Sequence, residues 1–309
     1  MIQIENLVKR YGDLVALDHL NLNVEEGEIF GLLGPNGSGK TTLINCILAL
    51  LKYEKGSITV FGKQMKPTSY DIKKNIGVVM QEVAVFDQMS VRENIDYFCG
   101  LYVKEKTRRK ELVDEAIHFV GLNTFEKMRP KKLSGGLLRR LNIACGIAHK
   151  PKLIILDEPT VAVDPQSRNK ILEGIQEMNR HGSTIIYTSH YMEEVEQICT
   201  RIAIIDHGRV LATGTNEELK QMIKPKENIT VQTIALESSH LADIEALPHV
   251  FDIHYDGENL KLRFHNDEQN LIHLISYFED KKISFGRVFS ERPTLNDVFL
   301  EITGTELRD

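Results

Sequence analysis

A glycine-rich stretch at residues 34–41, GPNGSGKT, carries residue types that bind phosphate. It lies between apolar runs at 29–33 and 43–48, so we expect a buried strand to lead into a turn that opens a helix. The three glycines let the backbone bend, and their N–H groups can converge beside a helix N-terminus that favours negative charge. Lys40 adds a positive charge, and Thr41 offers a hydroxyl where a magnesium ion would lie. The stretch matches the whole G-x-x-x-x-G-K-S/T phosphate loop, which favours a nucleoside triphosphate site over a glycine turn with an exposed lysine.

Two adjacent acids follow the apolar run 153–156. In an open parallel sheet, ligands bind beyond the carboxyl ends of the strands. Asp157 is therefore expected to hold magnesium, directly or through water, and Glu158 is placed to polarise a water molecule. The alternative is an acidic pair that only caps the next turn.

Gln81 and His190 also follow strands, predicted at 76–80 and 184–188. An amide at a strand end can ligate magnesium or orient water, and a neutral imidazole could donate to a γ-phosphate. Each signal is weak alone, because a single histidine is more often a surface or core residue.

A second glycine-containing helix start, LSGG at 133–136, predicts a second anion site. It lies far along the chain from the phosphate loop, inside a helical segment. One nucleotide cannot easily touch both sites in one chain, but two chains packed head to tail could hold it between them.

Together these motifs resemble an ABC-type ATPase over about residues 1–220. The residues that carry the resemblance are GPNGSGKT at 34–41, Gln81, LSGG at 133–136, LIILDE at 153–158, Val163-Asp164 and His190. The resemblance implies an α/β fold with a RecA-like parallel sheet core, an antiparallel β subdomain and a helical insert. Two departures are Leu137, where many members carry a polar residue, and the sequence 161–164 before the helix.

The resemblance also implies ATP and Mg²⁺ as ligands and a role for each site residue. Tyr11 would stack on adenine, Glu158 would be the catalytic base, and His190 would hold the γ-phosphate. Magnesium would be held by Thr41, Gln81 and Asp157. The implied ATP-binding residues are Tyr11, Gly34, Pro35, Asn36, Gly37, Ser38, Gly39, Lys40, Thr41, Thr42, Ser134, Gly135 and Gly136. The last three would close on the ATP of a second protomer, so a homodimer is expected.

The predicted elements place these residues. Residues 1–30 read as antiparallel strands, and the phosphate-loop helix is expected to run to about Leu51. The segment 90–149 reads as a helical insert, opened by a capping box of Ser90 and Glu93. The apolar face of its first helix is predicted to hold Val91, Ile95, Phe98 and Leu101. The α/β pattern then resumes, and Asp164-Pro165 should begin a helix that runs to about 180.

The C-terminal third reads as a separate module. We expect an ATPase domain at 1–223, a linker at 224–228 and an α+β domain at 229–309. The predicted elements are strand 229–236, helix 240–247, hairpin 250–265 turning at Asp256-Gly257, helix 267–280, strand 283–290 and a helix from Pro293. Their β-α-β-β-α-β order is typical of a ferredoxin-like fold. The ending PTLNDVFL at 293–300 resembles that of ATPases from ABC-2-type exporters, the drug- and antibiotic-export branch, and supports export over import.

Net charge, cysteine positions and the lengths of apolar runs argue against some classes of function. The net charge is −6, which argues against a nucleic-acid partner. The four cysteines are scattered among apolar residues and read as reduced core residues, not as disulfides or metal ligands. The first residues lack a signal-peptide pattern, and no apolar run approaches the length of a membrane span. We therefore expect a peripheral protein at the cytoplasmic face of the membrane, bound to a separate membrane-spanning permease.

Three functions are compatible with a phosphate loop in this chain. The favoured one is an ATP-hydrolysing subunit that powers export of a drug, antibiotic or lipid-like substrate. The alternative is a soluble ABC ATPase acting on the ribosome or DNA, but the chain has one ATPase cassette, no long coiled coil and no cysteine pair. A small-molecule kinase would share the phosphate loop but has no use for LSGG.

Overall fold

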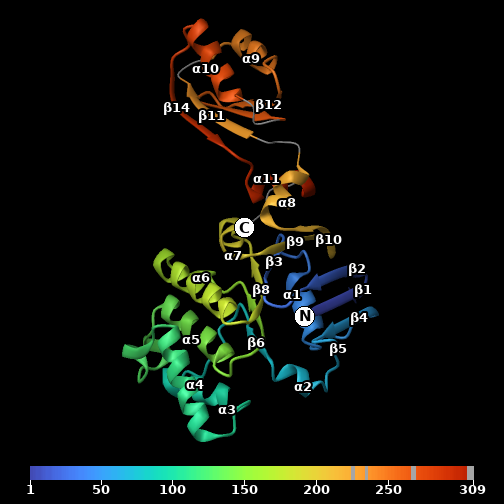
Figure 1. Ribbon diagram of the computed structural model, residues 1–309, viewed down its shortest axis with the longest axis vertical. Helices are drawn as coiled ribbons and strands as arrows, with labels where there is room; N and C mark the ends of the chain where they lie inside the picture. Colours follow the sequence, from blue (N-terminus) through green and yellow to red (C-terminus); the bar gives the residue numbers. More distant parts are fainter. Residues whose placement is uncertain (224–226, 234–235, 266–268, 305–309) are drawn as a thin grey trace. The chain divides into compact units, whose positions relative to one another are not determined.

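The computed structural model describes residues 1–223, 227–233, 236–265 and 269–304, and these divide into two compact units, 1–216 and 217–304 (Figure 1). The division lies between Asn216 and Glu217, earlier in the chain than the domain end expected at 223.

The larger unit is built on a six-stranded sheet. In sheet order its strands are β10 (Arg209–Gly214), β9 (Arg201–Asp206), β3 (Ile29–Leu33), β8 (Thr184–Ser189), β7 (Leu153–Asp157) and β6 (Ile76–Val79). The five strands from β9 to β6 are parallel, and β10 pairs antiparallel with β9 at the edge. Every residue of β3, β7 and β8 is buried, as expected for continuous apolar runs covered on both faces. The edge strand β10 has no counterpart among the predicted strands.

A second, antiparallel sheet precedes the first in the chain. Its order is β2 (Leu14–Val24), β1 (Ile2–Tyr11), β4 (Lys55–Val60) and β5 (Lys63–Gln64). One hydrophobic core joins residues of this sheet, of the six-stranded sheet and of α1 (Lys40–Ile47). The predicted antiparallel subdomain is confirmed, and α1 ends at Ile47, a turn before the expected Leu51.

Three more helices of this unit are α2 (Tyr70–Lys73), α6 (Pro165–Arg180) and α7 (Met192–Ile198). The start of α6 is as predicted, because the Asp164 side chain accepts a hydrogen bond from the Ser167 N–H at 2.9 Å and Pro165 takes the first helical position.

The helical insert is also confirmed. It contains α3 (Val91–Gly100), α4 (Lys106–Phe119), α5 (Gly135–Ile147) and two short 3₁₀ turns, Asn123–Phe125 and Pro130–Lys132. Both halves of the capping box on α3 are present, with the Glu93 N–H donating to Ser90 Oγ at 3.3 Å and the Ser90 N–H to Glu93 Oε2 at 2.7 Å. Leu101 is wrong as a core residue: it lies just beyond the helix and is 53% exposed. The fully buried Cys99 packs inward at the end of α3 instead.

The smaller unit has the predicted ferredoxin-like topology. Its sheet order is β12 (Val250–Tyr255), β13 (Asn259–Phe264), β11 (Glu227–Thr233) and β14 (Phe285–Glu291), antiparallel throughout. Its helices are α8 (Asn216–Met222), which begins at the unit boundary, α9 (Ser238–Glu245), α10 (Asn270–Asp280) and α11 (Leu295–Thr303). The hairpin turns at Asp256-Gly257, where Asp256 Oδ1 accepts from the N–H groups of Glu258 and Asn259.

Some C-terminal predictions need correction or fall outside the described residues. Of the expected linker 224–228, residues 227–228 are part of β11, and 224–226 lie outside the described ranges, as do 234–235, 266–268 and 305–309. Pro293 is not in the first turn of the last helix. Thr294 caps α11 in a capping box with Asp297, so Pro293 precedes the cap. The apolar stripe of that helix is fully buried at Leu295, Val298 and Phe299.

Candidate active site

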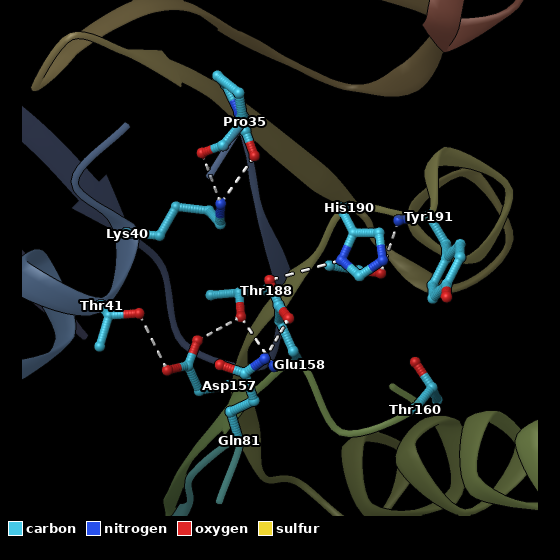
Figure 2. Close-up of polar contacts among 12 residues, drawn as sticks. Pro35, Lys40, Thr41, Gln81, Asp157, Glu158, Thr160, Thr188, His190 and Tyr191 are labelled. Carbon is cyan, nitrogen blue, oxygen red and sulfur yellow. Dashed lines mark hydrogen bonds and ion pairs between the residues drawn. The ribbon is translucent and has the colours of Figure 1, made fainter. Parts of the chain in front are cut away.

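The phosphate loop joins β3 to α1, as predicted. The Lys40 side chain is folded back onto this loop, and its Nζ donates to the carbonyl oxygens of Gly34 at 2.7 Å and Pro35 at 3.1 Å (Figure 2). Burial lowers the pKa of Lys40, and the nearby Glu158 and Asp157 carboxylates act in the opposite direction. The ammonium is thus a partly desolvated positive charge beside two acids.

The loop fits closely against its neighbours. Gly39 has φ +108°, and a Cβ added there would lie 2.7 Å from the carbonyl oxygen of Ala16 on β2. A Cβ at Gly34 would lie 2.1 Å from the carbonyl oxygen of Ile205 on β9. Only glycine fits at either position.

The loop also leaves polar groups open for an anion. The Ser38 hydroxyl is buried with no hydrogen-bond partner among the described residues. The N-terminus of α1 has no side-chain cap at Gly39. An unsatisfied hydroxyl and uncapped N–H groups beside a buried lysine are what a phosphate group requires.

Asp157 is fixed by hydroxyls from two other elements. Thr41 Oγ1 of α1 donates to Asp157 Oδ2 at 3.2 Å, and Thr188 Oγ1 of β8 donates to Asp157 Oδ1 at 2.7 Å. The carboxylate is 3% exposed. Sequence reasoning predicts the proximity of Thr41 and Asp157 but misses Thr188, whose only signal is its place on a neighbouring strand end.

Glu158 lies where the ends of three strands meet. Gln81, after β6, donates from Nε2 to Glu158 Oε2 at 3.1 Å, and His190, after β8, places Nδ1 3.5 Å from Glu158 Oε1 (Figure 2). The Glu158 backbone has φ +48°, and its N–H donates to Thr188 Oγ1 at 2.9 Å. Gln81, a predicted metal ligand, therefore contacts the predicted base.

Two buried charged residues that were not among the predicted site residues contact the segments around Glu158 and His190. Arg139 of α5 is 3% exposed and donates to the carbonyl oxygens of Met80, Gln81, Glu158 and Pro159. Glu194 of α7 is 3% exposed and contacts the residue before His190. Neither is recognisable from sequence, because a charged residue in a helix usually faces solvent.

The LSGG segment forms the start of α5. Ser134 caps the helix by accepting from the Leu137 N–H at 3.4 Å, and Ser134 and Gly135 are exposed. Gly136 is buried, and a Cβ added there would lie 2.5 Å from Ser167 Oγ on α6. Figure 1 shows α5 and α1 as separate helices of the larger unit, so its two predicted anion sites stand apart in one chain.

Tyr11, the predicted adenine contact, lies at the end of β1 and is 47% exposed. The Lys9 ammonium lies 5.0 Å from the centroid of its ring. The ring is thus available for stacking, and a cation already lies near it.

The oxygen atoms of Thr41 and Asp157 suit a magnesium ion that also binds phosphate and water, and not a metal ion held by protein side chains alone. Within the described residues, no group of three or more His, Cys, Asp or Glu side chains could hold a metal ion. Mg²⁺ is typically bound through one or two carboxylates together with substrate phosphates and water. The adjacent oxygens of Thr41 and Asp157, beside the phosphate loop, match that pattern.

Comparison with known proteins agrees with this geometry. The family model described as "ABC transporter" matches residues 17–161, and the model described as "ATP-binding protein DrrA1-3-like, C-terminal domain" matches residues 214–303. The linearmycin resistance ATP-binding protein LnrL of Bacillus subtilis is 37% identical, with all of both chains covered. The chain belongs to the ABC transporter ATP-binding proteins. Within them it falls in the ABC-2-type branch, as the sequence predicts.

Other ABC relatives match with similar coverage. The Nod factor export ATP-binding protein I of Rhizobium sp. (strain N33) is 35% identical, with 99% of this chain and 98% of that protein covered. The daunorubicin resistance ATP-binding protein DrrA3 of Streptomyces coeruleorubidus is 31% identical, with 99% and 97% covered.

Solved ABC structures resemble the larger unit. A dimeric ATP-binding cassette in a post-hydrolysis state, bound to ADP and Pi, is 27% identical, covers 70% of this chain and 98% of its own, and has a TM-score of 0.64. The cbiO1 subunit from Clostridium perfringens, part of the ABC transporter complex cbiONQ, is 29% identical, covers 71% and 89%, and has a TM-score of 0.66. This ABC protein is therefore an ATPase whose hydrolysis is coupled to transport. No helix in the described ranges is both long and apolar enough to cross a membrane.

Proposed function

We propose that this ABC ATPase powers the export of a drug, antibiotic or lipid-like molecule through a separate membrane-spanning permease, at the cytoplasmic face of the membrane. Relatives named for linearmycin resistance, daunorubicin resistance and Nod factor export support export and match over nearly the full chain. A role on the ribosome or DNA finds no support in these relatives or in the net charge of −6.

The contacts of the site residues support a role for each of them. Lys40 and the loop N–H groups would bind the β- and γ-phosphates, and Thr41 and Asp157 would hold Mg²⁺. When bound, the ion neutralises charge on the phosphate oxygens. Glu158 would accept a proton from the attacking water. His190, whose Nδ1 lies 3.5 Å from Glu158 Oε1, would contact the γ-phosphate.

We propose a dimer because the two predicted anion sites lie apart within one chain. The acid cluster and the phosphate loop form one site, while the exposed start of α5 presents Ser134 and Gly135 elsewhere. In a head-to-tail homodimer, Ser134 to Gly136 of one protomer would cover the ATP bound by Lys40 of the other. The exposed N–H groups of α5 would then face the phosphates.

The segment 82–89 is our candidate contact for the permease. It begins directly after Gln81, and its Val83 and Phe86 are 37% and 40% exposed. The Phe86 ring also packs on Tyr97 and Phe98 of α3, with centroids 5.0 and 5.8 Å away. A segment anchored on the insert, with apolar atoms still exposed, could transmit a partner's movement to Gln81.

Mixing two inactive variants tests the shared site. A Ser134→Arg chain should bind ATP through its own phosphate loop but fail to dimerise on it, because the larger side chain obstructs the contact. A Lys40→Ala chain should lose phosphate binding. In the mixed dimer, the intact loop of the first chain meets the intact LSGG of the second, so one complete site forms and ATPase activity returns in part.

The controls are each variant alone and a mixture of wild-type chains with chains that carry both Ser134→Arg and Lys40→Ala. That mixture, of wild-type and doubly changed chains, has no complete site in its heterodimer. Full activity of Ser134→Arg alone, or no recovery on mixing, would refute the shared site.

A further inference from the structure

Glu194, the buried carboxylate of α7 that contacts Ser189, makes further contacts beside the site. Its Oε2 accepts hydrogen bonds from three hydroxyls, those of Thr160 at 2.8 Å, Tyr187 at 2.6 Å and Ser189 at 2.9 Å. Its Oε1 forms an ion pair with Arg168 Nε at 3.3 Å. All three hydroxyl residues are at most 1% exposed, so these contacts are shielded from water.

Two of the hydroxyls lie on the loops that carry the reacting groups. Thr160 is two residues after Glu158, on the loop that leaves β7. Ser189 directly precedes His190 at the end of β8, and its Oγ also accepts from the Tyr191 N–H at 3.0 Å. Glu194 thus holds the chain on both sides of the contact between Glu158 and His190.

The third hydroxyl, that of Tyr187, comes from inside a strand and lies 3.4 Å from Thr160 Oγ1. Tyr187 is inside β8, where parallel pairing to both β3 and β7 fixes its backbone, whereas Ser189, the last residue of β8, pairs only with Leu33 of β3. The bond from Tyr187 to Glu194 therefore adds little to the position of either loop. This difference allows a positioning role to be separated from a general contribution to stability.

A buried carboxylate is costly unless every lone pair finds a donor. Here three hydroxyls donate to Oε2, and the Arg168 guanidinium balances the charge through its ion pair with Oε1. The same guanidinium lies 4.5 Å from the centroid of the Tyr191 ring. A side chain that only filled space could be apolar. A single acceptor oxygen shared by two loops instead ties the position of one loop to the position of the other.

We propose that Glu194 is a positioning residue for ATP hydrolysis: through Thr160 and Ser189 it holds the Glu158 and His190 loops in the one arrangement that aligns base and γ-phosphate contact. This inference rests on the proposed function of those two residues. Glu194 is 3% exposed and its contacts are with residues outside the phosphate loop, so its removal should lower kcat and leave ATP binding unchanged.

The test removes each hydroxyl separately in the full chain, because Glu194→Gln could fail to fold. Thr160→Val and Ser189→Ala each delete one loop bond, while Thr160→Ser keeps the hydroxyl and loses only a methyl group. Tyr187→Phe deletes a bond to the same carboxylate oxygen from inside a strand, together with the longer 3.4 Å contact to Thr160 Oγ1. For each variant, kcat, KM for ATP with Mg²⁺ and the melting temperature are measured.

We expect Thr160→Val and Ser189→Ala to lower kcat by about tenfold or more, the effect of one lost hydrogen bond to a charged group. KM should stay within about twofold, since the phosphate loop is untouched. Thr160→Ser and Tyr187→Phe should keep kcat near wild type while lowering the melting temperature. The double variant Thr160→Val with Ser189→Ala should lose less than the product of the single losses, because both act through one carboxylate.

Near wild-type kcat in both Thr160→Val and Ser189→Ala would overturn the inference, as would an equal loss of kcat in Tyr187→Phe. These outcomes are distinct from failure of the proposed function, which would show as wild-type protein without ATPase activity. An exposed neighbour on the same helix, changed as Glu193→Gln, should leave every readout at the wild-type value.

Discussion

Arg139 connects three segments of the active site without reaching the nucleotide position. Its guanidinium donates to the carbonyl oxygens of Gln81 at 2.7 Å, Met80 at 3.1 Å and Pro159 at 2.8 Å, and also to that of Glu158. A planar group with five N–H donors can satisfy carbonyls on several sides at once, which a lysine ammonium cannot. Arg139 therefore holds the chain around Gln81 and Glu158 together.

Replacing Arg139 by lysine should destabilise the protein by about 3 kcal/mol, because several buried carbonyl groups would lose their donors. Urea unfolding at neutral pH measures this free energy. Arg140→Lys is the matched control, since Arg140 makes one bond, from Nη1 to the Val120 carbonyl at 3.0 Å, and should cost about 1 kcal/mol or less. Equal effects at the two positions would contradict the assigned role.

Glu158→Gln should abolish most turnover while ATP binding persists. The amide keeps the size of the side chain but cannot take a proton from water, so kcat should fall by at least about a hundredfold. ATP should then hold the protein as a dimer, which sedimentation with ATP and Mg²⁺ detects. Asp157→Asn should instead weaken Mg²⁺ dependence first. Turnover near the wild-type rate in Glu158→Gln would exclude Glu158 as the base.

At the residue scale, the sequence predicts groups that lie at strand ends and misses groups that act from helices. Thr41, Asp157 and Glu158 are found because strand ends meet at one edge of a parallel sheet. Arg139 and Glu194 are missed because their roles depend on burial against other segments. Local sequence cannot show which charged side chain of a helix points inward.

At the element scale, the α3–α5 packing contains a buried titratable ring. His149 follows α5 and stacks on Tyr102, which follows α3, with centroids 3.9 Å apart and an angle of 8° between the rings. Burial lowers the pKa of His149 to about 4 from the ordinary 6.5. The folded protein thus holds this ring neutral at pH values where the unfolded chain protonates it.

The sign of the pH effect follows from this. Between pH 6.5 and about 4 the unfolded chain binds more protons at this position, so stability falls as the pH falls, by about 3 kcal/mol over the whole range. His149→Phe keeps the ring but cannot be protonated, and should remove that part of the loss. Urea unfolding at a series of pH values measures it, with the exposed His207→Gln as control. Parallel pH curves for wild type and His149→Phe would contradict this account.

At several predicted elements, a helix cap or a turn that is recognisable in the sequence is confirmed. The Ser90 box, the Asp164 cap and the Asp256-Gly257 turn all lie where predicted. The start of α11 differs from the prediction: a proline in the first turn is a common signal, but here Thr294 and Asp297 form the cap and Pro293 precedes it. The strand β10 was not predicted, since an edge strand lacks a long apolar run.

At the scale of the whole molecule, each of the two units has its own hydrophobic core residues. Those of the larger unit join its two sheets. Those of the ferredoxin-like module include Ile229, Val231, Phe264, Leu274 and Phe278. The order of elements in both units follows from periodicity and turns. The boundary between the units does not follow from periodicity and turns. The helix α8 is expected in the ATPase domain, but from Glu217 onward it is grouped with the smaller unit. Its Leu219 is buried, and that burial depends on tertiary contacts.

Because the two units are compact separately and the nucleotide site belongs to the larger one, we predict that they unfold in separate steps and respond differently to ATP. Calorimetry of Glu158→Gln, which binds without turnover, should show two transitions. ATP with Mg²⁺ at about a hundredfold excess over Kd should stabilise the ATPase unit by about 2.7 kcal/mol and raise only its transition, because a ligand stabilises the unit that binds it. Adding Lys40→Ala should abolish that shift by removing the buried ammonium from the phosphate loop, and both transitions should then stay where they are without ATP. A single transition that ATP moves as a whole would show that the module of residues 217–304 unfolds only together with the ATPase unit, and would contradict independent cores.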